Sequence, residues 1–446
     1  MRAGTDSASL IHSITVRRSL SAAVLVGALV WMSGCTASGP PAESTPPMPS
    51  NPYEDQRQAG VEELLADWAD AVSSNDAAAL EALVDPAASP EFLQSLIRTA
   101  SDLSDVPLSE WGYEIVDEPE TPVPSEVAER VAAADVWAPS VVLRYGVDGP
   151  DDLPTRRPIS LLVAERDDRW RLVSDTDIPG IDRHTWRGPW DFGPVTVTPI
   201  ATAGGTSMVL GKREQDLLTS RLATELPAAV EAVADFVGDD WPRKTLVVTT
   251  SSTDEFLASA GGVAGPDVAA VSVSDFVVPG DPVTGQRVIF SPSAAERLTD
   301  FTTRSVLRHE LTHIAARANT VDGSPTWMLE GFADYSGYRG SGVDFATLAP
   351  TLSRAVRAGG PPTVLPADSD FSAGGLRSTL AYESAWSLAA FVAERYGEQV
   401  LRDLYAQLAT GPHADAEISA GLEATVGSRP DTFIADWGAW VAQNAS

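Results

Sequence analysis

The stretch HELTH, residues 309–313, decides the fold of this chain. It lies in a segment whose pattern predicts a helix that begins near Thr299. On a helix, residues four positions apart lie on the same face, so the imidazoles of His309 and His313 can bind one metal ion with Glu310 beside it. The spacing therefore predicts a metal-binding helix.

A second stretch, PTWMLEGFADY at residues 325–335, offers a third metal ligand in addition to the two histidines. A catalytic zinc ion generally has three protein ligands and keeps a further position open. Ser324 as the N-cap and the proline at the first turn predict a new helix, on which Glu330 is the expected third ligand. Asp334 lies one turn further on the same face, where it can accept a hydrogen bond from a ligating histidine and fix the orientation of the ring.

The two stretches together resemble the paired motifs of the gluzincin, or peptidase MA-like, metallopeptidases, and the resemblance covers the C-terminal half of the chain. It implies that His309, His313 and Glu330 bind Zn²⁺. It also implies that Glu310 is the general base for a zinc-activated water that hydrolyses a bond in a peptide or protein substrate. Tyr382, in LAYESAWSLAAFVAERYG, matches a tyrosine of the family and is expected to donate a hydrogen bond to the oxyanion.

The rest of this C-terminal part is predicted as mixed α and β structure. Residues 268–273 and 287–290 are expected strands, and either could offer an edge on which an extended peptide pairs. The sequence leaves open which of the two does so. The other expected elements are strands at 195–200 and 245–250, a helix over 213–237 that is interrupted at Pro227, and only helices and loops after Thr299.

The N-terminal part has a different pattern. Helices are expected at 61–72, 77–84 and 91–100, followed by strands at 111–116, 136–147, 159–166 and 170–175, the last two joined as a hairpin over Asp167 and Asp168. This order, with LLADWADAVSSNDAAALEALV at its start and RWRLVSDTDI at its end, resembles the nuclear-transport-factor-2-like (SnoaL-like) fold. The expected fold class is thus α+β, with a cone-shaped domain at 53–185 followed by a zincin-type domain at 186–446. The first domain shows no acid–base pair and is interpreted as a spacer or docking domain.

The first 52 residues are predicted to be processed and anchored. The apolar stretch 20–31 follows two arginines and is shorter than the roughly 20 residues of a membrane-spanning helix, so residues 1–34 are interpreted as a signal peptide. The stretch MSGC, which ends in the only cysteine, resembles the lipobox of bacterial lipoproteins and implies a lipid on Cys35. Residues 35–52 are then a proline-rich tether, and the protein is expected at the extracytoplasmic face of the cell membrane.

The charge excludes one class of partner. The chain has 31 basic against 62 acidic residues and a formal net charge of −31, which argues against nucleic-acid binding. No glycine-rich phosphate loop is present, so a nucleotide is not expected either. Two functions remain: a zinc metallopeptidase, and a non-catalytic surface-binding lipoprotein with a structural zinc site.

Overall fold

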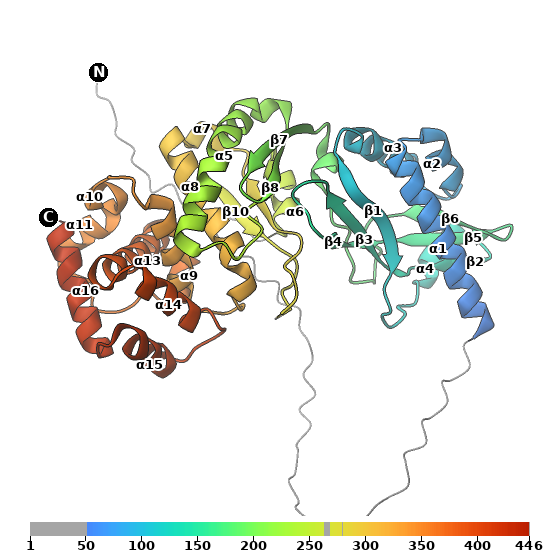
Figure 1. The fold of residues 1–446 in the computed structure, drawn as a ribbon. Coiled ribbons are helices and arrows are strands. Elements are labelled where there is room, and N and C mark those ends of the chain that lie inside the picture. Colours follow the sequence, from blue (N-terminus) through green and yellow to red (C-terminus); the bar gives the residue numbers. More distant parts are fainter. Residues whose placement is uncertain (1–50, 263–267, 279, 446) are drawn as a thin grey trace, which may run out of the picture.

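The computed structural model describes residues 51–262, 268–278 and 280–445 (Figure 1). The predicted signal peptide, Cys35 and the tether up to residue 50 lie outside these residues. No helix in the described part of the chain has the length and apolar composition needed to cross a membrane. The first helix begins at Pro52, which the sequence assigned to the tether, because the side chain of Asn51 caps the backbone N–H of Tyr53.

The N-terminal unit is an α+β structure with two three-stranded antiparallel sheets. The strand orders are β1-β3-β4 and β2-β5-β6, and the helices α1 to α3 precede the strands, as expected from the sequence. The elements are α1 (Pro52–Ser73), α2 (Ala77–Leu83), α3 (Pro90–Leu103), β1 (Leu108–Ile115), α4 (Ser125–Val131), β2 (Asp135–Trp137), β3 (Ser140–Val147), β4 (Thr155–Ser160), β5 (Leu162–Arg166) and β6 (Arg169–Ser174).

Two of the expected strands are each divided in this unit. The strand expected at 136–147 breaks into β2 and β3 at Pro139, which has no backbone N–H for a sheet ladder. The strand expected at 159–166 changes sheets at Leu161, between β4 and β5. The helix α4 was not predicted. The hairpin from β5 to β6 is confirmed, and both of its turn residues have the positive φ of a tight hairpin turn.

The C-terminal unit is built on a five-stranded sheet of order β10-β11-β9-β8-β7. The three inner strands are parallel, and the two edge strands β7 and β10 run antiparallel to their neighbours. The strand β8 was not predicted; it forms a hairpin with β7. The strands are β7 (Thr196–Thr202), β8 (Gly205–Gly211), β9 (Leu246–Thr249), β10 (Ala270–Val273) and β11 (Arg287–Phe290).

Helices make up the remainder of this unit. The interruption expected at Pro227 is wrong: α5 continues through it, because the residues around the proline are buried against α8 and the sheet. After Thr299 the described residues form only helices and loops, as predicted. The helices are α5 (Asp216–Val237), α6 (Thr253–Ser259), α7 (Ala294–Arg297), α8 (Asp300–Ala316), α9 (Thr326–Tyr338), α10 (Phe345–Leu348), α11 (Pro350–Gly359), α12 (Asp368–Phe371), α13 (Gly375–Tyr396), α14 (Glu398–Leu408), α15 (Asp415–Val426) and α16 (Pro430–Asn444), with short 3₁₀ turns at Pro189–Phe192, Arg213–Gln215 and Arg317–Asn319.

One of the hydrophobic clusters in the core contains residues from both units. Successive side chains of a strand point to opposite faces of the sheet. In β8, Val209 therefore packs with α5 and α8, whereas Met208 and Leu210 pack with residues of the N-terminal unit such as Tyr145. The N-terminal unit thus covers the face of the five-stranded sheet opposite α5 and α8 (Figure 1). The expected α+β class is confirmed for both units.

Candidate metal centre

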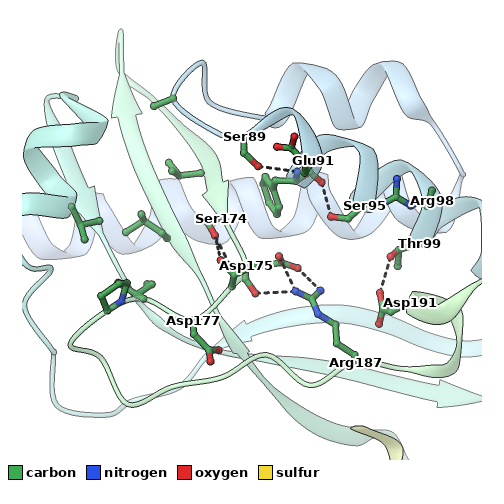
Figure 2. A pocket seen from close by; sticks show the side chains of 18 of the residues that line it. Ser89, Glu91, Ser95, Arg98, Thr99, Ser174, Asp175, Asp177, Arg187 and Asp191 are labelled. Atoms are coloured by element: carbon green, nitrogen blue, oxygen red, sulfur yellow. Dashed lines mark hydrogen bonds and ion pairs between the residues drawn. The ribbon is translucent and has the colours of Figure 1, made fainter. Parts of the chain in front are cut away.

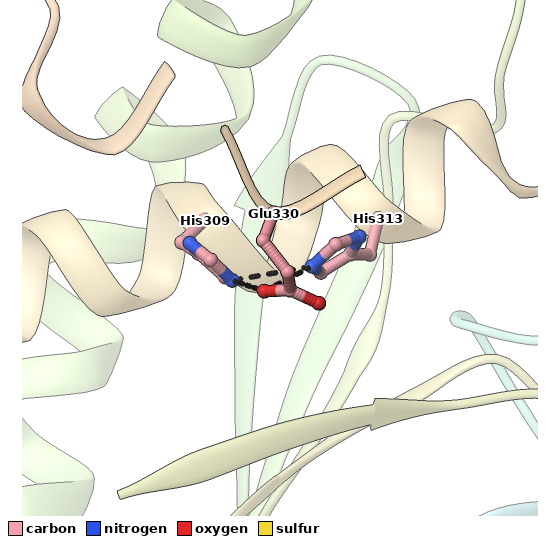
Figure 3. A group of neighbouring side chains, drawn as sticks. All are labelled: His309, His313 and Glu330. Atoms are coloured by element: carbon pink, nitrogen blue, oxygen red, sulfur yellow. Dashed lines mark hydrogen bonds and ion pairs between the residues drawn. The ribbon is translucent and has the colours of Figure 1, made fainter. Parts of the chain in front are cut away.

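Two packed helices bring the predicted metal ligands together. His309 and His313 lie on α8 and Glu330 lies on α9, with their side chains directed at one point (Figure 3). The helices approach closely at Gly337, where a Cβ atom would lie 2.8 Å from the carbonyl oxygen of Ser305. Any larger residue at this position would push α9 away from α8.

The ligand atoms lie within reach of a single ion. The Nε2 atoms of His309 and His313 are 3.1 Å apart, and Oε2 of Glu330 lies 3.4 and 3.7 Å from them, respectively. Among the described residues, this is the group of three or more potential ligands close enough to hold a metal ion. Two imidazole nitrogens and one carboxylate oxygen are a donor set of catalytic zinc sites, so the residues present fit that ion.

Asp334 orients the first ligand. Its Oδ1 atom lies 2.8 Å from Nδ1 of His309, on the side of the ring opposite to Nε2. Both side chains are buried. A proton on Nδ1 shared with Asp334 leaves the Nε2 lone pair directed toward His313 and Glu330, as a metal ligand requires.

The charges of the cluster stabilise one another. Burial opposes the ionisation of Glu330, but the nearby His313 and His309 outweigh it and lower the pKa of Glu330 to about 2. Burial also opposes a charge on His309, yet Asp334 and Glu330 together raise the pKa of this imidazole well above its usual range. The site therefore attracts positive charge, which a divalent cation supplies as well as protons do.

Glu310 is a buried carboxylate beside the ligands. It is 1% exposed, and neither of its oxygens makes a regular hydrogen bond within the described parts of the chain. Burial raises the pKa of Glu310, and the nearby imidazoles of His309 and His313 offset this rise in part. A weak interaction with Ser272 on β10 also lowers the pKa. Buried carboxylates are usually hydrogen-bonded, so Glu310 is unusual among buried acids and is chemically able to exchange a proton at this place.

Tyr382 belongs to the same neighbourhood. It lies on α13, which packs against α9, and it is 4% exposed. Burial raises the pKa of its hydroxyl well above 10, and the charges of Glu330, Asp334 and Glu310 raise it further. The charges of these three carboxylates thus act on the hydroxyl, while its ring packs edge-on against Phe371.

Other sequence-based expectations are decided by the fold. The strand β11 lies between β10 and β9, so β10 is the edge of the sheet, and it packs against α8. Trp327 and Phe332 on α9 are core residues. Ser324 does not cap α9; its hydroxyl accepts a hydrogen bond from the backbone of Gly411 instead. That β10 lies beside the helix carrying Glu310 could not be predicted from the sequence, because it depends on how the sheet packs on α8.

A cavity of about 970 Å³ lies in the N-terminal unit, between α3, α4 and the segment after β6 (Figure 2). Two of its carboxylates have side-chain partners within the cavity wall. Arg187 binds Asp175 through both carboxylate oxygens, and Thr99 donates to Asp191 at 2.7 Å. None of the metal-cluster residues lines this cavity.

Comparison with known proteins agrees with the geometry of the cluster. Residues 288–443 match the peptidase MA superfamily. This segment includes the three predicted metal ligands, Glu310 and Tyr382. Residues 288–443, which lie within the C-terminal unit, are therefore similar to a peptidase MA superfamily domain. No curated protein matches the chain.

Two solved structures illustrate its structural neighbours. The native yeast LTA4 hydrolase has 11% identity and a TM-score of 0.36, with 68% of this chain and 50% of that chain covered. An M1 zinc metallopeptidase from Deinococcus radiodurans has 15% identity and a TM-score of 0.32, with 62% and 58% covered. The chain thus spans only part of the length of either neighbour.

Proposed function

We propose that this protein is a zinc-dependent peptidase. The observation that supports the proposal best is the convergence of His309, His313 and Glu330 beside the buried carboxylate of Glu310. The match of residues 288–443 to the peptidase MA superfamily supports it independently.

Each residue of the cluster has a defined task in this proposal. His309, His313 and Glu330 hold Zn²⁺, which when bound supplies a Lewis acid that polarises a carbonyl and lowers the pKa of water. An Oε atom of Glu310 takes the proton of the attacking water and later delivers it to the leaving amine. The hydroxyl of Tyr382 donates a hydrogen bond to the oxyanion.

The substrate is a peptide or protein in extended conformation. Its backbone pairs with the free edge of β10, since an exposed strand edge offers unpaired N–H and C=O groups. The packing of β10 against α8, the helix that carries Glu310, supports this placement, because it brings the edge strand next to the helix of the proposed base.

The location of the protein is a further part of the proposal. Cys35 receives a lipid, the residues after it form a tether, and the folded body works at the extracytoplasmic face of the cell membrane. The sequence around Cys35 supports this. The N-terminal unit is proposed to be nuclear-transport-factor-2-like, which the order of three helices followed by antiparallel strands supports.

The substitution Glu310→Gln tests the enzymatic role. It keeps the size of the side chain but removes the base, so cleavage of a peptide library should fall strongly while bound zinc stays unchanged. Equal cleavage by the variant and the native protein would refute the role of Glu310.

The second candidate is a non-catalytic surface-binding lipoprotein with a structural zinc site. The observation that favours it is the cavity of about 970 Å³ in the N-terminal unit, away from the metal cluster. If this candidate holds, neither the native protein nor the Glu310→Gln variant cleaves peptides, although both contain zinc.

A further inference from the structure

The hairpin formed by β10 and β11 lies between the metal-binding helix and the N-terminal unit. On the side of the helix, Gln286 donates a hydrogen bond to the backbone oxygen of Ile314, the residue after the ligand His313. Arg317, just beyond α8, donates to the hydroxyl of Ser274 at 3.0 Å. These bonds attach both ends of the loop between β10 and β11 to the end of α8.

The N-terminal unit holds the same loop from the other side, through Asp275. This carboxylate accepts hydrogen bonds from Thr155 and from Thr284, each at 2.7 Å, and forms an ion pair with Arg157 at 2.7 Å. Thr155 and Arg157 lie on β4, and the side chains of Arg157 and Asp275 are only 11% and 17% exposed. The loop itself is shaped around the carboxylate: a Cβ on Gly285 would lie 2.5 Å from Asp275 Oδ1.

A second ion pair fixes the other strand with the opposite arrangement of charges. Here the N-terminal unit provides the acid, Asp151, and β11 provides the base, Arg287. Both guanidinium Nη atoms lie 2.6 Å from the carboxylate oxygens, and both side chains are buried. The hairpin is therefore held against the N-terminal unit by two ion pairs, one at Asp275 in the loop after β10 and one at Arg287 on β11.

We propose that Arg157 and Asp275 are positioning residues that hold the edge strand β10 in place beside Glu310. The N-terminal unit is then a structural part of the substrate-binding side of the peptidase, in addition to any spacer role. Asp275 comes two residues after Val273, the last residue of β10. Loss of its partner Arg157 is therefore expected to free this end of the strand. This inference rests on the proposed function only where it concerns substrate.

The test uses Arg157→Ala in the full-length protein, with Arg156→Ala as the matched control. Arg156 is the preceding residue on the same strand, but it is exposed and its partner is Glu114. Hydrogen–deuterium exchange of the backbone amides at residues 270–273 is the first readout, because it needs no activity. We expect faster exchange there in Arg157→Ala, native exchange in Arg156→Ala, and partial rescue by Arg157→Lys.

Kinetics on a peptide substrate provide the second readout. A displaced edge weakens substrate alignment, so KM should rise roughly fivefold while kcat and zinc content stay within about twofold of the native values. If Arg157→Ala destabilises the whole protein, Thr155→Val is measured in its place, since it removes a hydrogen bond to Asp275 and keeps the shape of the side chain.

The outcomes separate this inference from the proposed function. Unchanged exchange at residues 270–273 in both Arg157→Ala and Thr155→Val would overturn the positioning role, whatever the activity. Faster exchange with an unchanged KM would overturn the link to substrate. Faster exchange in a protein whose native form cleaves no peptide would confirm that the N-terminal unit holds β10 and would refute the peptidase proposal.

Discussion

His309 and Asp334 are joined side chain to side chain, with 2.8 Å between Nδ1 and Oδ1, in the interior between α8 and α9. This contact determines which ring nitrogen of His309 faces the other two proposed ligands. It also means that α9 contributes to the cluster twice, through Glu330 and through the contact of Asp334 with His309 on the neighbouring helix.

Removal of this contact should weaken metal binding without abolishing it. Loss of a residue that orients a ligating histidine typically lowers metal affinity by about 10- to 100-fold, and we expect a loss of this size in Asp334→Ala. Competition with a chromophoric chelator measures the affinity, and Asp403→Ala, at a position on α14 outside the cluster, is the control. Native affinity in Asp334→Ala would show that the contact does not hold the ring.

Tyr382 should affect turnover more than stability. The substitution Tyr382→Phe keeps the ring that packs on Phe371 and removes only the hydroxyl near the carboxylates. Loss of one oxyanion donor costs about 10²- to 10³-fold in kcat. Steady-state kinetics together with a denaturation curve distinguish the roles, because a purely structural tyrosine would leave kcat unchanged.

Glu383 predicts a pH dependence of stability. Burial raises its pKa from 4.5 to about 7, although the backbone N–H of Leu352 at the start of α11 donates to it at 2.6 Å. The folded state therefore holds this proton more tightly than the unfolded state, so the contribution of Glu383 to stability is present below pH 4.5 and is lost as the pH rises to about 7.

The variant Glu383→Gln isolates this effect. It keeps an acceptor for Leu352 but does not titrate. Relative to the variant, the native protein should lose on the order of 3 kcal/mol of unfolding free energy between pH 4.5 and pH 8. Chemical denaturation at both pH values measures the difference, and parallel curves for the two proteins would contradict the assignment.

The buried ion pair between the units predicts a large loss of stability. Asp151→Ala leaves the guanidinium of Arg287 buried without its partner, which typically costs about 3–5 kcal/mol. The neighbouring Asp152 pairs with Lys244 but is 69% exposed, so Asp152→Ala should cost less than about 1 kcal/mol. Similar losses in the two variants, measured by denaturant unfolding, would contradict this difference.

The helices that carry His309, His313 and Glu330 could be predicted because the signal lies in short stretches of sequence. The spacing within HELTH and between Glu330 and Asp334 places each pair on one helical face, and the structure confirms both helices. The strand β8 was missed because two glycines bound it and its last five residues, 207–211, are all buried, which removes the alternation expected of a strand.

The contacts between the units could not be predicted in this way. Arg157 lies on β4 and Asp275 lies in the loop after β10, far away in the sequence, and nothing in the neighbourhood of either residue indicates the other. The hydrophobic core that the two units share could not be predicted from the sequence for the same reason. Met208 and Leu210 contact the N-terminal unit because of the face on which they lie, and this face is known only when the sheet is assembled.

The zinc content of the purified protein shows whether His309, His313 and Glu330 form a metal site. Elemental mass spectrometry of the native chain is compared with Glu330→Ala and with Glu417→Ala, which changes an exposed glutamate on α15. The account predicts about one zinc ion per chain in the native protein and in Glu417→Ala, and a clear reduction in Glu330→Ala. The absence of zinc from all three proteins, even after zinc is supplied, would contradict it.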